Sequence, residues 1–199
     1  MKISITLILS IISLSLSAQT PYEIEISQWQ KELNDSFVDE ETSPLDKKSL
    51  RKFDGLDYFP INEKYRITAE FVRTPNELPF TMPTTTTEVK VFEKYGEARF
   101  SLDGEEIILP LYQSHSLRLK EEYADYLFLP FTDMTNGNET YGGGRYIDMK
   151  IPDGDTIIVD FNKAYNPSCA YNENYSCPIP PPENRLNVAI TAGEKNFHK

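Results

Sequence analysis

The chain has 199 residues, a formal net charge of −11 and two cysteines. This length is enough for one domain with a sizeable hydrophobic core. The excess of acidic side chains opposes binding to nucleic acid and to anionic membrane surfaces, so we exclude both as partners.

The first 18 residues have the pattern of a secretory signal peptide. Lys2 is followed by an apolar run over residues 3–16 and then by small residues up to Ala18. This is the order of a charged region, an apolar region and a cleavage site, and the run is too short to span a bilayer comfortably. We therefore expect cleavage near Ala18, a periplasmic or secreted protein, and no integral membrane segment in the mature chain.

A short N-terminal helix is predicted from Pro21 to Leu33. The apolar residues of PYEIEISQWQKEL recur in steps of four, three and four, which is helical spacing; they are Tyr22, Ile26, Trp29 and Leu33. A second short helix is predicted between Asp46 and Gly55, because a helix-capping residue follows Ser43-Pro44 there.

After Gly55 the pattern changes to strands. In KYRITAEFVRT, apolar residues alternate with mostly polar ones, which indicates a half-buried strand. Asp103-Gly104 predicts a two-residue hairpin turn within residues 97–114, and Asp153-Gly154 predicts a second turn. Further strands are predicted within residues 84–96, 125–133, 143–152, 155–165 and 185–195, whereas residues 115–126 fit either a short helix or a strand. These elements predict one mainly β domain over residues 19–199, an antiparallel β-barrel or sandwich with a short N-terminal helix.

Two long stretches carry a family resemblance. They are FDGLDYFPINEKYRI, from residue 53, and LFLPFTDMTNGNETYGGGRYIDMKIPDGDTIIVDFNKAYNPSCAYNENYSCPIPPPENRLNVAITAGEKNF, from residue 127. Together they resemble the DUF1684 family of bacterial proteins over about residues 22–197. The resemblance implies export, since family members are often exported, but it implies no activity because the family is defined by an unknown function.

Three consecutive glycines, Gly142–Gly144, precede Arg145 in ETYGGGRYID. A nucleotide-binding P-loop is excluded, because the Lys-Ser/Thr pair is missing and Arg145 leads into a strand. Two interpretations stay open. The glycines could form a bulge or tight bend, or they could keep the backbone bare so that a ligand can approach beside Tyr141 and Arg145.

Polar residues also gather at the start of a long loop, residues 165–185, which we call the Cys/Pro loop. Asp160 ends an apolar strand, and Asn162, Tyr165 and Asn166 follow it. A carboxylate and amides at this place could orient a polar ligand, or they could satisfy buried backbone groups of the loop. Both roles use the same hydrogen bonds, so the sequence leaves both open.

The prolines of PIPPPENR predict a stiff, extended path at the end of the Cys/Pro loop. Glu183, Asn184 and Arg185 follow them. Arg185 could bind a carboxylate or phosphate through two parallel hydrogen bonds. It could equally pair with Asp160 or Asp148 inside the protein.

The two cysteines, Cys169 and Cys177, lie in the same loop. Export favours a disulfide between them, with two buried free thiols or a metal pair as the alternatives. A metal site is the weakest alternative, because tight thiolate sites usually need four ligands and the two histidines, His115 and His198, lie far away in sequence. We predict no metal and no cofactor.

Three functional hypotheses follow. The first is an exported protein that binds a small polar or anionic ligand between the Gly-rich turn and the Cys/Pro loop. Its candidate residues are Tyr141, Arg145, Asp160, Asn162, Tyr165, Asn166, Glu183, Asn184 and Arg185. The second is a hydrolase acting on an envelope glycan or ester through a pair of carboxylates, chosen from Asp133, Asp148, Asp160 and Glu183. The third is a structural or interaction protein with no small-molecule site.

Overall fold

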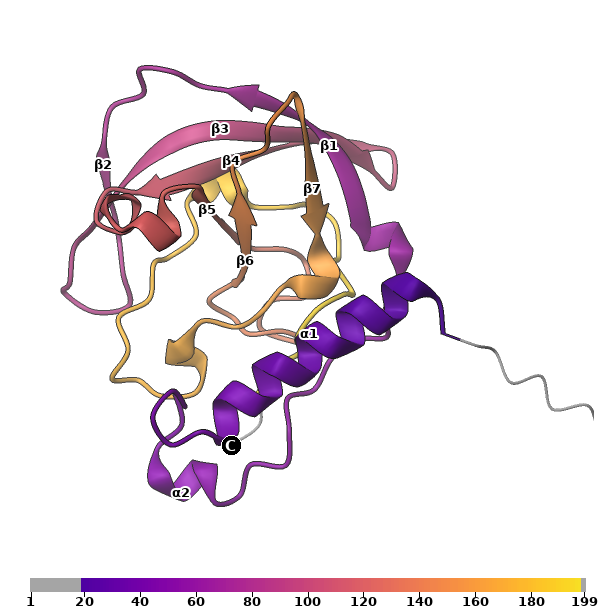
Figure 1. Cartoon of the computed structure of the whole chain (residues 1–199), viewed down its shortest axis with the longest axis vertical. Helices are drawn as coiled ribbons and strands as arrows, with labels where there is room; N and C mark the ends of the chain where they lie inside the picture. The colour runs from indigo at the N-terminus through magenta and orange to yellow at the C-terminus, as the bar shows by residue number, and fades with distance from the viewer. Residues whose placement is uncertain (1–18, 198–199) are drawn as a thin grey trace, which may run out of the picture.

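A computed structural model describes residues 19–197 of the chain. The expected signal peptide lies outside the described residues. Within residues 19–197, no helix is both long enough and apolar enough to cross a membrane. Figure 1 shows one curled sheet with a long helix across its lower end.

Helix α1 spans Pro21–Val38 and is longer than predicted. Its start is fixed by a capping box: the Thr20 side chain accepts the Glu23 N–H, and the Glu23 carboxylate accepts the Thr20 N–H. The predicted apolar face continues by one more step of four residues to Phe37, which is buried, and this contact extends the helix beyond Leu33.

The predicted second helix is also present. Helix α2 spans Lys47–Leu50. The Asp46 carboxylate caps it by accepting the backbone N–H groups of Lys48 and Ser49. The helix is a single turn, and the chain then runs in an irregular path past Gly55 to the first strand.

Seven antiparallel strands form one sheet with the order β6-β5-β4-β3-β1-β7, and β2 pairs with β3 beside this path. The strands are β1 (Arg66–Arg73), β2 (Phe80–Met82), β3 (Lys90–Leu102), β4 (Glu105–Ser114), β5 (Tyr126–Phe131), β6 (Arg145–Lys150) and β7 (Thr156–Asp160). The sheet curls into a half-barrel (Figure 1). Its two end strands, β6 and β7, are not paired with each other, which leaves an open seam between them. The mainly β prediction is confirmed, and the choice between barrel and sandwich is settled as a single curled sheet.

The hairpin predicted at Asp103-Gly104 joins β3 and β4. Both residues have positive φ, 55° and 84°, as a two-residue turn between twisted strands requires. Residues 90–96 of the segment predicted at 84–96 and the first half of the hairpin form the single long strand β3, which contains a register shift between Lys94 and Gly96. Residues 84–89 lie outside the strand.

Residues 115–126, which fitted either a short helix or a strand, contain two single-turn 3₁₀ helices, Leu117–Leu119 and Glu121–Tyr123. Two other segments differ from the predictions. Strand β2 was not predicted, because three residues are too few for a periodic signal. The strand predicted within residues 185–195 is wrong: this segment is irregular, since buried side chains of Arg145 and Asp133, rather than a neighbouring strand, bind much of its backbone.

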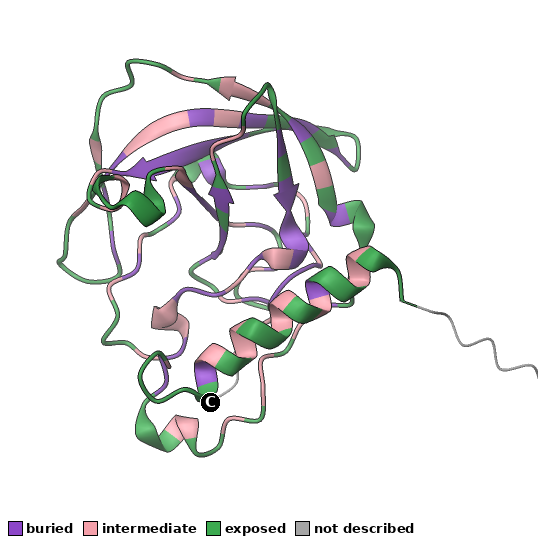
Figure 2. Ribbon diagram, in the orientation of Figure 1, coloured by how far each residue is buried: buried purple, intermediate pink, exposed green. Residues whose placement is uncertain are grey.

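Part of the sheet, around β5, is covered on both faces. Alternate residues of β5 pack into two different clusters: Leu127 and Leu129 lie in the main core on the inner face, whereas Phe128 lies in an aromatic cluster on the outer face. The outer cluster contains Met82, Phe92, Tyr112, Phe128 and Tyr146, with Phe80, Tyr126 and Tyr165 packed against it. Figure 2 shows that many of the buried residues lie in the strands, while much of α1 is exposed.

Candidate functional site

Most of the predicted site residues form separate networks inside the protein. Arg145 is 0% exposed and lies at the end of the Gly-rich turn, at the start of β6. Its guanidinium donates to the Asp133 carboxylate at 2.9 Å and to the backbone carbonyls of Ile190, Ala192 and Glu194. All of these partners belong to the protein, so the hydrogen bonds of Arg145 hold the C-terminal segment against the sheet.

The glycine triplet is a tight bend. Gly144 has φ of +90°, and a Cβ atom at this position would lie 2.6 Å from the carbonyl oxygen of Phe131. Gly142 has no comparable contact, since its nearest neighbour would be Gly137 at 3.6 Å. The close approach that excludes a side chain at Gly144 is therefore to the protein's own backbone, which favours the first of the two interpretations.

Asp160 and Asn162 tie α1 to the sheet. The Tyr22 hydroxyl of α1 donates to both carboxylate oxygens of Asp160, at 2.9 and 3.0 Å. Burial, together with the Asp160 charge, raises the pKa of Tyr22 above its ordinary value. The Asn162 side chain bonds to Asp160, to Tyr22 and to both backbone groups of Asn62.

A buried acid that the sequence reasoning missed holds the start of the Cys/Pro loop. Glu194 is 1% exposed and accepts the backbone and side-chain N–H groups of Asn166, each at 2.9 Å. The Tyr171 hydroxyl donates to the same carboxylate. Burial raises the pKa of Glu194 to about 7. No local pattern around TAGEK distinguishes this acid from an exposed one.

The end of the Cys/Pro loop is anchored to β4. The Tyr112 hydroxyl donates to Asn184 Oδ1 at 2.9 Å and to the Glu183 carboxylate at 3.1 Å, and Asn184 Nδ2 donates to the Pro110 carbonyl. Arg185 is exposed beside a surface hollow of about 190 Å³. The alternative in which Arg185 pairs with Asp160 or Asp148 is not found among the described residues, since these carboxylates accept the hydroxyls of Tyr22 and Tyr165 instead.

Tyr165 is different, because it lines a cavity of about 270 Å³ where the Cys/Pro loop crosses the outer face of the sheet. We call this cavity the aromatic pocket. Its lining residues are Lys90, Phe92, Ser114, Ser116, Leu117, Tyr126, Phe128, Tyr146, Tyr165 and Pro178. Phe92 and Phe128 stack at a centroid distance of 5.6 Å. Tyr146 forms edge-to-face contacts with Phe128 and Tyr165, at centroid distances of 4.7 and 5.9 Å.

Polar groups lie at the rim of the aromatic pocket. Among the described lining residues, Lys90 is the one with a charged side chain. Its Nζ donates to the Ser176 carbonyl at 2.7 Å, and its side chain is 34% exposed. The hydroxyls of Ser114 and Ser116 bond to each other at 3.1 Å.

The two rim tyrosines share one acceptor. The hydroxyls of Tyr126 and Tyr165 both donate to Asp148 Oδ1, each at 2.7 Å. Burial and the nearby Asp148 charge raise the pKa of both tyrosines, so their hydroxyls stay protonated. The two side chains are thereby held in fixed positions at the edge of the aromatic pocket.

The two cysteines lie behind this pocket as free thiols, and the predicted disulfide is not formed in the structure. The Cys169 N–H donates to Cys177 Sγ at 3.2 Å, and the Tyr141 hydroxyl lies 3.7 Å from Cys169 Sγ. A hydrogen bond from the Cys177 thiol lowers the pKa of Cys169 to about 6. Pro178, which follows Cys177, lines the pocket and accepts a hydrogen bond from the Tyr146 hydroxyl.

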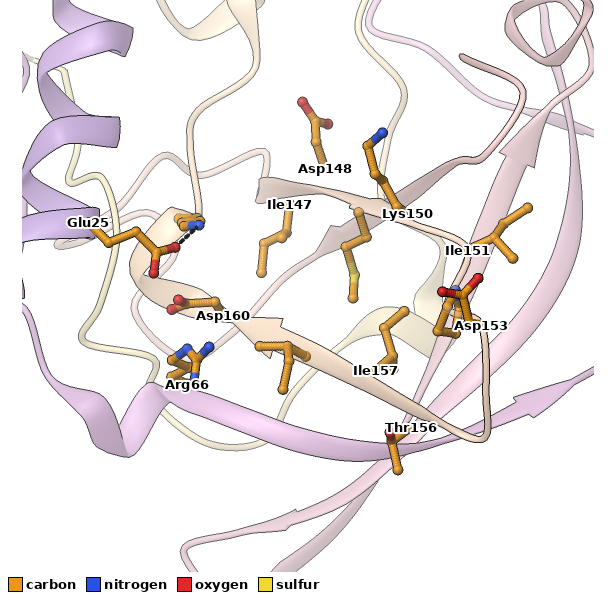
Figure 3. A pocket seen from close by; sticks show the side chains of 14 residues that line it. Glu25, Arg66, Ile147, Asp148, Lys150, Ile151, Asp153, Thr156, Ile157 and Asp160 are labelled. Carbon is orange, nitrogen blue, oxygen red and sulfur yellow. Dashed lines mark hydrogen bonds and ion pairs between the residues drawn. The ribbon is translucent and has the colours of Figure 1, made fainter. Parts of the chain in front are cut away.

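A second, more polar cavity of about 460 Å³ occupies the open seam between β6 and β7 (Figure 3). Glu25, Arg66 and Asp160 lie at one end of this seam cleft, and Lys150 and Asp153 lie at the other (Figure 3). Its floor is apolar, formed by residues such as Ile147, Met149 and Ile157.

The seam cleft also contains two of the four candidate carboxylates. Asp148 and Asp160 both line it, whereas Asp133 is buried against Arg145 and Glu183 lies at Tyr112. Within residues 19–197, no three His, Cys, Asp or Glu side chains gather closely enough to hold a metal ion.

The fold and its cavities define a small, mainly β protein, built as a half-barrel with an aromatic pocket under its Cys/Pro loop. The family model described as "Protein of unknown function (DUF1684)" matches residues 51–195, and the chain belongs to this family, which confirms the resemblance.

A solved structure supports the same assignment. The chain is 32% identical to an uncharacterised protein from gene locus rrnAC0354 of Haloarcula marismortui, whose structure was solved by solution NMR, and the match has a TM-score of 0.68. It covers 87% of this chain and 94% of the archaeal one. No curated protein matches the chain significantly.

Proposed function

We propose that the protein binds a small molecule with a flat apolar body and an anionic group in the aromatic pocket. The observation that carries the proposal is the combination of aromatic walls with one lysine at the rim. Ligand sites are typically concave, mainly apolar or aromatic, and contain a few polar groups that fix the orientation of the ligand.

The size of the pocket limits the ligand. Its volume of about 270 Å³ is just below the range of about 300–1,000 Å³ that is usual for ligand pockets. A molecule built on one ring therefore fits better than a dinucleotide or an oligosaccharide. The edge-to-face contacts between Phe128, Tyr146 and Tyr165 hold the walls in place and leave ring surface for stacking.

Lys90 supports the choice of an anion. Its ammonium group has three N–H donors, and the Ser176 carbonyl accepts from it at 2.7 Å. Glu88 Oε2 lies at 3.9 Å, at the limit of an ion pair, and is more exposed than Lys90. A carboxylate in the pocket would gain a charge-assisted hydrogen bond in a half-buried site, where attraction is stronger than in water.

The proposal changes the residues that we assign to the ligand. Tyr165 lines the pocket, while Arg145, Asn166 and Asn184 use their hydrogen bonds within the protein. Lys90 therefore replaces Arg145 and Arg185 as the expected partner of the anionic group.

A titration with matched probes tests this function. Benzoate and the neutral analogue benzyl alcohol would be added to ¹⁵N-labelled wild type, Lys90→Gln and Lys150→Gln protein, with amide chemical shifts as the readout. We expect benzoate to shift the amides of β3, β5 and β6 and of residues 165–178, with affinity at least about 5-fold weaker in Lys90→Gln, as for a lost hydrogen bond to a charged group. Benzyl alcohol should bind equally to all three proteins. Equal benzoate affinity in Lys90→Gln and wild type would contradict the proposal.

Hydrolysis in the seam cleft is a second candidate, favoured by the presence of Asp148 and Asp160 in the same cavity. A pair of carboxyl groups across a cleft can act as general acid and base on a glycan or ester. Each of these carboxylates accepts a hydrogen bond from at least one tyrosine hydroxyl. These bonds fix the orientation of the carboxylate but also use part of its capacity to accept hydrogen bonds. The test is hydrolysis of 4-nitrophenyl glycosides and esters by wild type, Asp148→Asn and Asp160→Asn; activity that survives both substitutions would remove this candidate.

We also propose that the protein is exported, with cleavage near Ala18. The order of charged, apolar and small residues in the first 18 positions supports this. N-terminal sequencing of protein isolated from periplasm and culture medium tests it, and a mature protein that still begins at Met1 would contradict it.

A further inference from the structure

We propose that Cys169 and Cys177 form a thiol–disulfide exchange site for low-molecular-weight disulfides, in which Cys169 attacks and Cys177 resolves. This activity is separate from ligand binding in the aromatic pocket. In this proposal the two cysteines change between the thiol and the disulfide form, whereas the cysteines of a purely structural disulfide stay oxidised.

The geometry brings the two cysteines together without a bond between them. They are eight residues apart, and the chain between them turns back so that the Cys169 N–H reaches Cys177 Sγ at 3.2 Å. Cys177 is held in place by Thr85, whose hydroxyl accepts the Cys177 N–H and whose N–H donates to the Cys177 carbonyl. Cys169 lies in a single 3₁₀ turn, Ser168–Ala170. The Cys177 sulfur therefore already lies against the backbone of Cys169.

The two thiols differ in exposure. Cys169 is partly exposed, whereas Cys177 is 6% exposed. A small disulfide from solution can therefore reach Cys169 first. Cys177 can react only with a sulfur that is already bound at Cys169. This is the arrangement that an attacking and a resolving cysteine require.

The neighbouring groups favour a thiolate at Cys169. Cys177 lies next to Cys169, and the Tyr141 hydroxyl lies 3.7 Å from Cys169 Sγ. Hydrogen bonding by these neighbours lowers the pKa of Cys169. The charged group near Cys177 is Lys90, which opposes the rise in its pKa that the Cys169 thiolate and burial cause. Tyr146 also faces the pair and stays protonated.

The reaction balances without a further reactant. The Cys169 thiolate attacks one sulfur of a disulfide R–S–S–R, forms a mixed disulfide and releases one thiolate, RS⁻. Cys177 then loses its proton and attacks Cys169 Sγ, which forms the Cys169–Cys177 disulfide and releases the second RS⁻. The protein dithiol is oxidised by two electrons, and the small disulfide is reduced to two thiols.

Alkylation by iodoacetamide measures which thiol is reactive. In Cys177→Ser, which keeps a hydroxyl donor beside Cys169, we expect the rate to rise much less steeply from pH 6 to pH 9 than for an ordinary thiol, because neighbouring hydrogen-bond donors lower the pKa of Cys169. An ordinary thiol with a pKa of about 8.5 would show a rise of about 200-fold over this interval. Cys169→Ser is the matched control and should stay almost unreactive at pH 7.

Exchange with oxidised glutathione tests the resolving step. Reduced wild type should become an internal disulfide and release two glutathione thiols, whereas Cys177→Ser should keep one glutathione on Cys169. Peptide mapping of partly alkylated wild type shows which cysteine reacts first and needs no substitution, so the test survives a variant that fails to fold. Labelling of Cys177 before Cys169, or wild type that retains glutathione without closing the internal disulfide, would overturn the proposal.

Discussion

Arg145→Met is the substitution that most sharply separates a structural from a ligand-binding role at the Gly-rich turn. The methionine keeps the apolar length of the side chain but removes four hydrogen-bonded partners. Asp133 would then be a buried carboxylate without its cation, since both side chains are 0% exposed.

The magnitude follows from these contacts. Breaking a buried ion pair by removing one partner costs about 3–5 kcal/mol, and three carbonyls that lose their donor add about 1 kcal/mol or more. Asp133 keeps donors from Thr135 and Ile190, which limits the loss. We expect the free energy of unfolding to fall by about 4–6 kcal/mol, a large part of the roughly 5–15 kcal/mol of a natural domain.

Equilibrium urea unfolding measures this loss, with Arg185→Met as a matched control. Arg185 is exposed, so its substitution should change stability by less than about 0.5 kcal/mol. Arg145→Lys keeps the charge but not the planar fork, and it should fall between the two. Asp133→Asn should cost less in the Arg145→Met background than in wild type, because the pair is coupled. A loss below about 1 kcal/mol for Arg145→Met would refute the conclusion that Arg145 holds the C-terminal segment against the sheet.

Three further predictions concern the loop networks. Gly144→Ala should destabilise the protein by about 2 kcal/mol or more, through its positive φ and the contact with the Phe131 carbonyl, whereas Gly142→Ala should cost little; equal unfolding midpoints would contradict this. The raised pKa of Glu194 means that its contribution to stability is complete below about pH 4.5 and is lost as the pH rises to about 7, so wild type should lose about 3 kcal/mol more than Glu194→Gln between these pH values in urea unfolding. Parallel stability curves for the two proteins would exclude that linkage. Asn184→Ala, which orphans the Pro110 carbonyl, should lower the unfolding free energy by about 2–4 kcal/mol, and thermal unfolding that matches wild type would contradict it.

Local patterns predicted much of the sheet because its strands follow a period of two. The Asp103-Gly104 turn and the alternation in residues 64–74 identified β1, β3 and β4. Residues 185–195 show a similar alternation of apolar and polar residues to residues 64–74, yet no strand forms there. The partners of that backbone are the side chains of Arg145 and Asp133, and a pattern in one segment carries no information about distant side chains.

The candidate residues illustrate a related limit. Polar residues beside a long loop must satisfy its buried backbone groups whether or not they bind a ligand. Asn166 and Asn184 have this internal role, and their residue types could not reveal it. The aromatic pocket left a signal in LFLPF: a run that is apolar on both faces indicates a strand covered on both sides, as Phe128 on the outer face is.

Native mass spectrometry of the protein isolated from its own host tests the central claim, a ligand in the aromatic pocket, most directly. Wild type would be compared with Ser116→Trp, which fills the pocket from its exposed rim, and with Ser101→Trp, an exposed position on β3 outside the pocket lining. We predict a bound small molecule on wild type and Ser101→Trp that is absent from Ser116→Trp. Wild type that carries no such molecule, or Ser116→Trp that retains it, would contradict a ligand in this pocket.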